Sequence, residues 1–290
     1  MNQSSSPNHN YFPLSKALLV IFLSTLMVSG SATVGWLYYL HFIGSRSEVE
    51  DYNIQAIIQT GPERESLKSV YLAELLGLSV DRPVNLYRFD TNSAEESLVR
   101  SPVIKTAKVS VQLPGTVYVD YTVRTPIAYV YDYENAAIDS EGVVFPLSPF
   151  FTPKKLTNIY LGTQEEISWG AELKNEGVVL SLSLLKIFSQ DRYKEAFDVK
   201  RIDVSNAFSE SYGQRQIVLI LEDRLSESQN GNSRILRMST RSYERELDNY
   251  LVLQDYLLEK EEADKGEEEL GQSPPMIVDL RIPRLAFLKK

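Results

Sequence analysis

The stretch AKVSVQLPGTVYVDYTV, residues 107–123, alternates between apolar and polar side chains on both sides of a central break. Alternation with a period of two residues is typical of a β-strand that buries one face. The break falls at Pro114 and Gly115, which are both residues that favour turns. The stretch therefore predicts a β-hairpin whose valine-rich face is buried.

The residues upstream of this hairpin predict one strand and two helices. Residues 52–60 alternate loosely, which suits a first strand. A helix is expected to begin at Pro62, with Gly77 as its stop signal, and a shorter one to end before Pro102. Apolar residues at helical spacing mark the first of these helices: Leu67, Tyr71, Leu75 and Leu78. The order strand, helix, helix, strand, strand predicts a compact α+β domain over residues 52–126.

The residues downstream of the hairpin predict a larger, mixed β domain with helices over residues 127–290. One helix is indicated by a stripe at Leu180, Leu184, Ile187 and Phe188, and a longer one by residues 242–260. The expected strands are residues 128–132, 137–138, 143–145, 199–204, 215–222 and 234–239. The chain ends with MIVDLRIPRLAFLKK, which predicts a strand that runs towards the terminus with an interruption at Pro283.

The stretch ALLVIFLSTLMVSGSATVGWLYYLHFIG, residues 17–44, contains no formally charged side chain. It exceeds the roughly 20 residues that a helix needs to cross a bilayer, so we predict a transmembrane helix over residues 17–43. Trp36, Tyr38 and Tyr39 gather near its end, and aromatic rings of this kind favour the membrane interface. Lys16 marks the other end, which places residues 1–16 in the cytoplasm as a short tail. A short polar joint, residues 45–51, follows the span.

A cleaved signal peptide is the alternative interpretation of this segment. Gly30, Ser31 and Ala32 resemble a cleavage site of small residues. The apolar run continues past them to Ile43, which favours an uncleaved anchor. Both interpretations place the remaining chain outside the cytoplasm.

Composition argues against several classes of function. The 290-residue sequence carries a formal net charge of -9, so it lacks the basic excess that nucleic-acid binding requires. It has no cysteine, which excludes thiolate metal sites, disulfides and cysteine nucleophiles. Its two histidines, His9 and His41, lie in the tail and in the span, where they cannot serve an outer domain as bases or metal ligands.

The acidic run EKEEADKGEEE, residues 259–269, has two interpretations, a cation site or a solvated loop. We favour the loop, because like charges repel one another and nothing apolar there could order them. The sequence therefore predicts a non-enzymatic protein without a cofactor or a metal.

Residues 101–148, SPVIKTAKVSVQLPGTVYVDYTVRTPIAYVYDYENAAIDSEGVVFPLS, resemble the central stretch of the FtsQ/DivIB family of bacterial cell-division proteins. In that family a proline-led segment precedes a strand, a proline turn and a second strand. An arginine, a spacer, Pro-Val-Ala and a later Asp-x-x-Gly-x-x-Phe follow. The matching positions here are Pro102, Ala107, Val109, Pro114, Thr116, Arg124, Pro126, Ala128, Asp139, Gly142 and Phe145.

A second match lies near the C-terminus, where residues 278–281, VDLR, are similar to the family's terminal Asp-Leu-Arg-Tyr strand. The chain departs from the family where tryptophans, an acidic residue and a terminal tyrosine are usual. These positions are Val103, Leu113, Val123 and Ile282. Most of the replacements are apolar and preserve the strand pattern, so the chain is identified as a divergent member of the family.

The resemblance implies a divisome scaffold without activity of its own, anchored in the cell inner membrane at the division site. Its N-terminus would be cytoplasmic, residues 52–126 would form a POTRA domain, and residues 127–290 would form the C-terminal β domain. The POTRA domain would recruit other membrane proteins of the divisome. The β domain would capture coiled-coil partners of the FtsB and FtsL type, which control septal peptidoglycan synthesis. Self-association stays open.

The resemblance also implies where such a partner binds. In the resembling proteins the residues after Asp-Leu-Arg belong to a strand that adds a partner strand. The corresponding positions here are Ile282, Arg284, Leu285, Ala286 and Phe287. Arg215 is a further candidate by approximate alignment with a family arginine on a neighbouring strand. Pro283 has no amide proton to donate, so pairing must begin after it or leave its nitrogen facing away from the partner.

Two other functions fit the anchor and the fold order. An anchored envelope enzyme or glycan-binding protein would have to rely on pairs of carboxylates, and nothing in the sequence singles out such a pair. A POTRA-type outer-membrane assembly factor would need a long series of barrel strands, which the sequence lacks.

Overall fold

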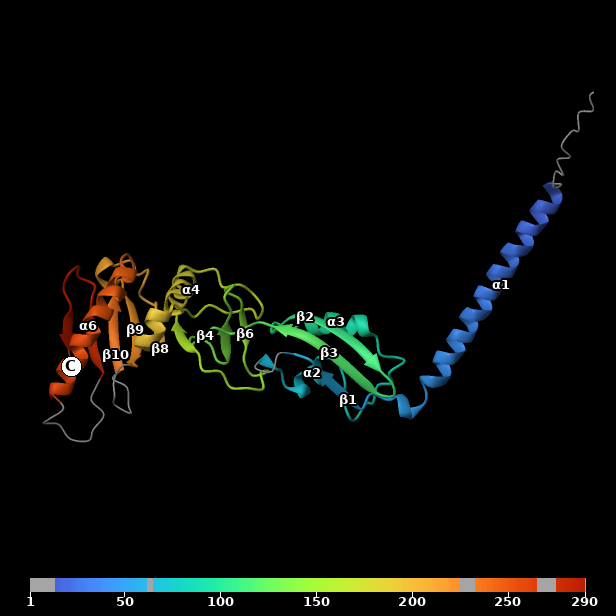
Figure 1. Ribbon diagram of the computed structural model, residues 1–290, viewed down its shortest axis with the longest axis horizontal. Coiled ribbons are helices and arrows are strands. Elements are labelled where there is room, and N and C mark those ends of the chain that lie inside the picture. The colour runs from blue at the N-terminus through green and yellow to red at the C-terminus, as the bar shows by residue number, and fades with distance from the viewer. Residues whose placement is uncertain (1–13, 62–64, 225–232, 265–274, 290) are drawn as a thin grey trace, which may run out of the picture. The chain divides into compact units, whose positions relative to one another are not determined.

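The computed structural model describes residues 14–61, 65–224, 233–264 and 275–289. The protein is α+β, with an N-terminal apolar helix followed by a sheet-rich body (Figure 1). It divides into two compact units. Unit 1 comprises the residues up to Ile58, Leu78–Thr91 and Ser110–Tyr118, and unit 2 comprises the rest.

The N-terminal helix α1 spans Leu14–Arg46, 33 residues, and is long and apolar enough to cross a membrane. At 1.5 Å per residue it measures about 50 Å, which exceeds the ~30 Å of a bilayer's hydrocarbon core. Large apolar side chains such as Phe22 and Met27 are exposed along it. A helix that is apolar all round requires burial in protein or lipid. The predicted span is therefore extended at both ends, while residues 1–13 of the predicted tail lie outside the described residues.

The first sheet has the strand order β1-β3-β2 and is accompanied by two helices. Its strands are β1 (Ala56–Gln59), β2 (Ile104–Gln112) and β3 (Thr116–Val123), and the helices are α2 (Ser69–Leu75) and α3 (Thr91–Val99). The order strand, helix, helix, strand, strand is as predicted. The first helix begins later than predicted, because Leu67 instead forms an isolated bridge with Phe150 and donates its backbone N–H to the Tyr121 hydroxyl. Pro62 lies outside the described residues.

In the described part of unit 2, nine strands form one sheet with the order β12-β11-β10-β9-β8-β7-β4-β5-β6. They are β4 (Ala128–Val130), β5 (Ala136–Ile138), β6 (Val144–Pro146), β7 (Thr157–Tyr160), β8 (Phe197–Asp203), β9 (Ile217–Asp223), β10 (Ser233–Met238), β11 (Met276–Asp279) and β12 (Phe287–Lys289). The helices of this region are α4 (Glu176–Phe188), α5 (Asp191–Ala196) and α6 (Tyr243–Asp264). The pairs β4/β7, β7/β8 and β10/β11 are parallel, and the other pairs are antiparallel.

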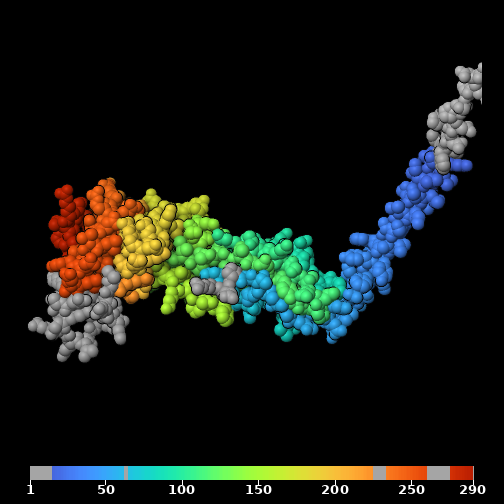
Figure 2. Space-filling view, viewed as in Figure 1, coloured from blue at the N-terminus to red at the C-terminus, as the bar shows by residue number. Residues whose placement is uncertain are grey.

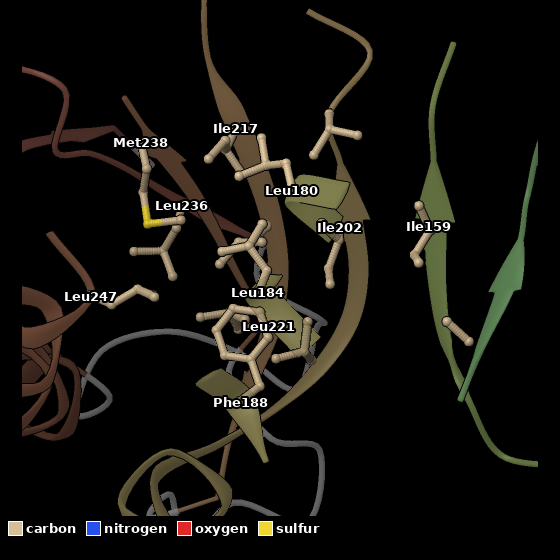
Figure 3. Packing of buried hydrophobic residues seen from close by; sticks show 14 of the residues in the cluster. Ile159, Leu180, Leu184, Phe188, Ile202, Ile217, Leu221, Leu236, Met238 and Leu247 are labelled. Atoms are coloured by element: carbon tan, nitrogen blue, oxygen red, sulfur yellow. The ribbon is translucent and has the colours of Figure 1, made fainter. Parts of the chain in front are cut away.

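The core of unit 2 lies between one face of this sheet and the helices (Figure 3). In β9, alternate residues from Ile217 to Asp223 are buried, as the two-residue period requires. Ile217, Leu219 and Leu221 of this series belong to one apolar cluster with the stripe of α4, which includes Leu184 and Phe188, and with Leu247 of α6. Each such side chain stabilises the fold by roughly 1.5–3 kcal/mol when it is fully removed from water.

Arg124, which follows β3, is fixed by the turn between β5 and β6. Its Nη1 lies 2.8 Å from Asp139 Oδ2 and 3.3 Å from Glu141 Oε2. The other oxygen of Asp139 accepts the backbone N–H groups of Glu141 and Val143, and Gly142 adopts a φ of 81°, which favours glycine. The arginine and the Asp-x-x-Gly motif quoted above therefore meet in one structural contact.

Candidate functional site

The C-terminal residues form a hairpin at one edge of the large sheet. Strand β12 pairs antiparallel with β11, with Asp279 opposite Phe287 and Ile277 opposite Lys289. The prediction of a strand that runs on towards the terminus is therefore wrong, because the chain reverses at residues 280–286 and returns alongside β11. Leu285 donates its backbone N–H to the Ile282 carbonyl (3.1 Å), and Arg284 has a φ of 67°. Pro283 lies in this turn, where no strand needs its missing amide proton.

Strand β12 is the last strand in the sheet, and within the described ranges no other strand pairs with its outer side. The opposite edge of the sheet differs. There Val144 of β6 donates to the Ala171 carbonyl (3.1 Å) and accepts from Gly170 (2.8 Å), so residues 170–172 cover the edge. An uncovered edge offers backbone donors and acceptors to a further strand.

The predicted site residues after Asp-Leu-Arg all lie at the surface of unit 2, in the C-terminal segment coloured red in Figure 2. Ile282, Leu285 and Phe287 are 50%, 56% and 54% exposed, so three apolar side chains within six residues face solvent. Arg284 and Ala286 are also exposed. Only Phe287 belongs to β12, and the other four belong to the turn. Clustered exposed apolar groups of this kind mark interaction surfaces.

The structure places Arg215 two strands away from this hairpin, at the same end of the sheet. The register runs from Val218 of β9 to Arg237 of β10, Asp279 of β11 and Phe287 of β12. Arg215 immediately precedes β9, donates from Nε to the Ser209 carbonyl (2.6 Å) and lies over the ring of Tyr212, 4.3 Å from its centroid. Its guanidinium is thus held in place beside the row of strand ends.

Sequence reasoning missed the polar network between Arg215 and the hairpin. Arg237 donates from Nε and Nη2 to Gln216 Oε1 (2.9 and 2.6 Å), and Arg281 donates to both oxygens of Asp279 (2.9 and 2.7 Å). Arg237 Nη1 also lies 3.6 Å from Asp279. A shallow polar pocket of about 330 Å³ opens here, lined by Asn206, Gly213, Gln214, Gln216, Arg237 and Arg281. The i, i+2 spacing of Asp279 and Arg281 was the available signal, because it places both on one side of a strand.

The charges of this network stabilise the ionised form of Asp279. Partial burial raises the pKa of Asp279, but the hydrogen bonds from Arg281 and the charges of Arg281 and Arg237 lower it by more. The net pKa of Asp279 therefore lies below its ordinary value of 3.8. The same contact raises the pKa of Arg281, so both groups are charged at neutral pH.

A buried ion pair fixes the strands behind the hairpin. Arg234 of β10 and Asp223 of β9 are almost inaccessible to solvent, and Arg234 Nε donates to Asp223 Oδ2 at 2.8 Å. The other oxygen of Asp223 accepts from Tyr250 (2.9 Å) and Gln254 (2.8 Å) of α6. Arg234 Nη1 also lies 3.4 Å from the sulfur of Met276, the first residue of β11. One ionic cluster thereby holds three strands and a helix together.

Residues 265–269 of the acidic run lie outside the described residues. Among the residues that the structure does describe, no three His, Cys, Asp or Glu side chains are placed so that they could hold a metal ion.

No known family model matches the sequence, and no curated protein matches it either. The similarity to FtsQ/DivIB proteins thus rests on the residues quoted from the sequence.

Proposed function

We propose that this protein is a membrane-anchored scaffold of bacterial cell division, without catalytic activity of its own. It captures a coiled-coil partner of the FtsB and FtsL type by adding a partner strand to β12. The observation that carries the proposal is the outer edge of β12, with which no other strand pairs among the residues that the structure describes, beside the exposed Ile282, Leu285 and Phe287. These residues directly follow the Asp-Leu-Arg sequence that resembles the family.

The backbone of β12 and the side chains beside it would have different roles in recognition. Main-chain hydrogen bonds to the edge supply affinity without regard to sequence, and side chains beside the edge supply specificity. Phe287 is suited to be the apolar anchor, since it lies on β12 itself and half of its surface is exposed. Arg284 and Arg215 offer positive charge to an acidic residue of the partner.

The remaining parts of the chain have complementary roles in this proposal. Helix α1 holds the protein in the cell inner membrane with the N-terminus in the cytoplasm, at the division site. The order of β1, α2, α3, β2 and β3 supports a POTRA domain over residues 52–126, which would recruit other membrane proteins of the divisome. The strands from β4 onwards belong to the C-terminal β domain, residues 127–290.

The test measures binding of the detergent-solubilised full chain to the FtsB/FtsL-type pair of the same organism. Phe287→Ala should weaken binding by about 2 kcal/mol, about 30-fold in Kd, because it removes the apolar anchor. Leu288→Pro removes an amide proton from β12 and should weaken binding if the main chain pairs with the partner. Truncation after Arg281 should abolish capture.

Val252→Ala is the matched control. Val252 is an apolar residue that is 79% exposed, and it belongs to α6 rather than to the C-terminal hairpin. It should leave the affinity unchanged. Unchanged binding after the truncation would show that the partner site lies elsewhere. Failure of the full chain to bind the pair at all would contradict the proposed function.

A further inference from the structure

The end of α1 is attached to the folded part of unit 1 by the buried side chain of Asn85. Its Nδ2 donates to the carbonyl oxygens of Arg46 (3.2 Å) and Val49 (3.0 Å), at and just after the helix end. Its Oδ1 accepts the backbone N–H of Tyr87 (2.9 Å). The last carbonyls of a helix have no partner within the helix, so an amide that satisfies one of them also fixes the helix end. Asn85 is 7% exposed, which shields these hydrogen bonds from water.

The side chain of Arg46, the last residue of α1, lies among three aromatic rings. Its Nη1 donates to the Tyr87 hydroxyl (2.9 Å), and its guanidinium carbon lies 4.1 Å from the ring centroid of Phe42, 5.5 Å from that of Tyr52 and 5.9 Å from that of Tyr87. All three distances are within the range of a cation–π interaction. Tyr52 and Tyr87 also contact each other edge to face, 5.2 Å between centroids. The rings come from α1, from the following 3-10 turn (Glu50–Tyr52) and from the loop at residues 84–87.

Backbone hydrogen bonds extend this attachment to the turn between β2 and β3. The Tyr52 carbonyl accepts from Leu86 (2.8 Å), and Ile54 donates to the Val84 carbonyl (2.9 Å). The Gly115 carbonyl then accepts from the backbone of residues 55 and 56, at 2.8 and 3.3 Å. All of these residues belong to unit 1, together with α1.

We propose that α1 and the folded part of unit 1 form one rigid body, clamped by Arg46 and Asn85, with no hinge at the membrane surface. The sequence predicts a polar joint at residues 45–51. In the structure, however, Asn85 and Tyr87 form hydrogen bonds with this segment. Rotation or tilting of the membrane helix is therefore transmitted to the β2–β3 turn. This coupling is independent of the partner site on β12.

The absence of cysteine allows a direct test, because two introduced cysteines carry the only labels. His41→Cys on α1 and Arg88→Cys in the folded part are both at exposed positions. Spin labels at this pair are measured by double electron–electron resonance in the full chain, reconstituted in lipid nanodiscs. A rigid clamp gives one narrow distance distribution. Arg46→Gln and Asn85→Ala should each lose the narrow peak, whereas Arg100→Gln, which alters an exposed arginine in unit 2, should keep it.

A second label pair, Asp81→Cys with Gln112→Cys, reports on the folded part alone. Its distance distribution should stay narrow in every variant. If Arg46→Gln broadens this pair as well, Tyr87→Phe decides the question, because it removes only the hydroxyl that Arg46 contacts. Loss of the narrow His41–Arg88 peak in that variant supports the clamp. A broad distribution in the parent pair, or a narrow one that survives in Arg46→Gln, Asn85→Ala and Tyr87→Phe, would overturn the proposal.

Discussion

Asp223 and Arg234 show how a single ion pair determines the position of neighbouring strands. Burial of a lone charge is costly, and a buried pair is tolerated only when each partner is compensated by the other and by hydrogen bonds. Asp223 accepts three such bonds, from Arg234, Tyr250 and Gln254. Burial and the charge of Asp223 raise the pKa of the Tyr250 hydroxyl, so Tyr250 remains a donor in this cluster.

Removal of Asp223 should therefore destabilise the protein severely. Asp223→Ala removes the buried carboxylate to which Arg234, Tyr250 and Gln254 donate, and we expect a loss of about 3–5 kcal/mol in the free energy of unfolding. The measurement is urea unfolding of the full chain in detergent, followed by the fluorescence of Trp169 in a Trp36→Phe background. Asp198→Ala is the control, because Asp198 pairs with Lys200 at the surface and should cost about 1 kcal/mol or less.

The double variant Asp223→Leu with Arg234→Met separates charge burial from packing. Replacement of both charges by apolar residues of similar size should recover much of the stability that Asp223→Ala loses. A double variant as unstable as Asp223→Ala would contradict this explanation.

The sequence contains a signal for this pair. Asp223 continues the buried series Ile217, Leu219 and Leu221 with a period of two, and Arg234 similarly precedes Leu236 and Met238. Two opposite charges in phase with buried faces indicate a buried pair once the two strands are known to be neighbours. Their contact across β9 and β10 depends on strand pairing, which periodicity does not provide.

At the scale of elements, prediction succeeded where a periodic pattern was long. The hairpin of β2 and β3 and the helices α4 and α6 have such patterns and lie close to their predicted positions. Short elements were predicted less consistently, because so few residues establish a period only weakly. The three-residue strands β4, β5 and β6 were predicted, whereas strand β7 (Thr157–Tyr160) and helix α5 (Asp191–Ala196) were missed. The C-terminal hairpin was missed because Arg284, rather than glycine, adopts the left-handed conformation in its turn.

Gly115 illustrates a role that the turn sequence alone did not predict. It was interpreted as a turn residue, but a side chain there would overlap with the Asn53 carbonyl oxygen. Gly115→Ala should therefore push the β2–β3 turn away from residues 53–56 and cost about 1–3 kcal/mol in the free energy of unfolding. Hydrogen exchange of the amides of residues 55 and 56, which bond to Gly115, should accelerate in this variant.

Gly213→Ala provides the comparison for this prediction. No atom lies within 4 Å of the Cβ that it would add, and its φ is not in the left-handed region. Its stability should be unchanged or slightly higher. Equal stability of the two variants would show that the close approach at Gly115 has no energetic importance.

At the scale of the whole molecule, α1 is long and apolar enough to cross a membrane, and the proposed topology places the residues after it outside the cytoplasm. We expect a reporter that is active only outside the cytoplasm to be active when fused after Ser47, the first residue beyond α1. Mass spectrometry of the mature protein should recover peptides from the N-terminal tail, because the continuous helix favours an uncleaved anchor. A mature chain that begins near Thr33 would instead establish a cleaved signal peptide.

The two edges of the large sheet differ, and this difference limits how many further strands the sheet can bind. One edge is already occupied by residues 170–172, so within the described part of the sheet only β12 can accept another strand. A sheet with two free edges can polymerise through successive copies, whereas a sheet with one is monovalent. One added strand therefore occupies the edge that this sheet offers. Two copies that paired through β12 would also block each other's edge, so dimerisation and partner capture would compete for the same strand.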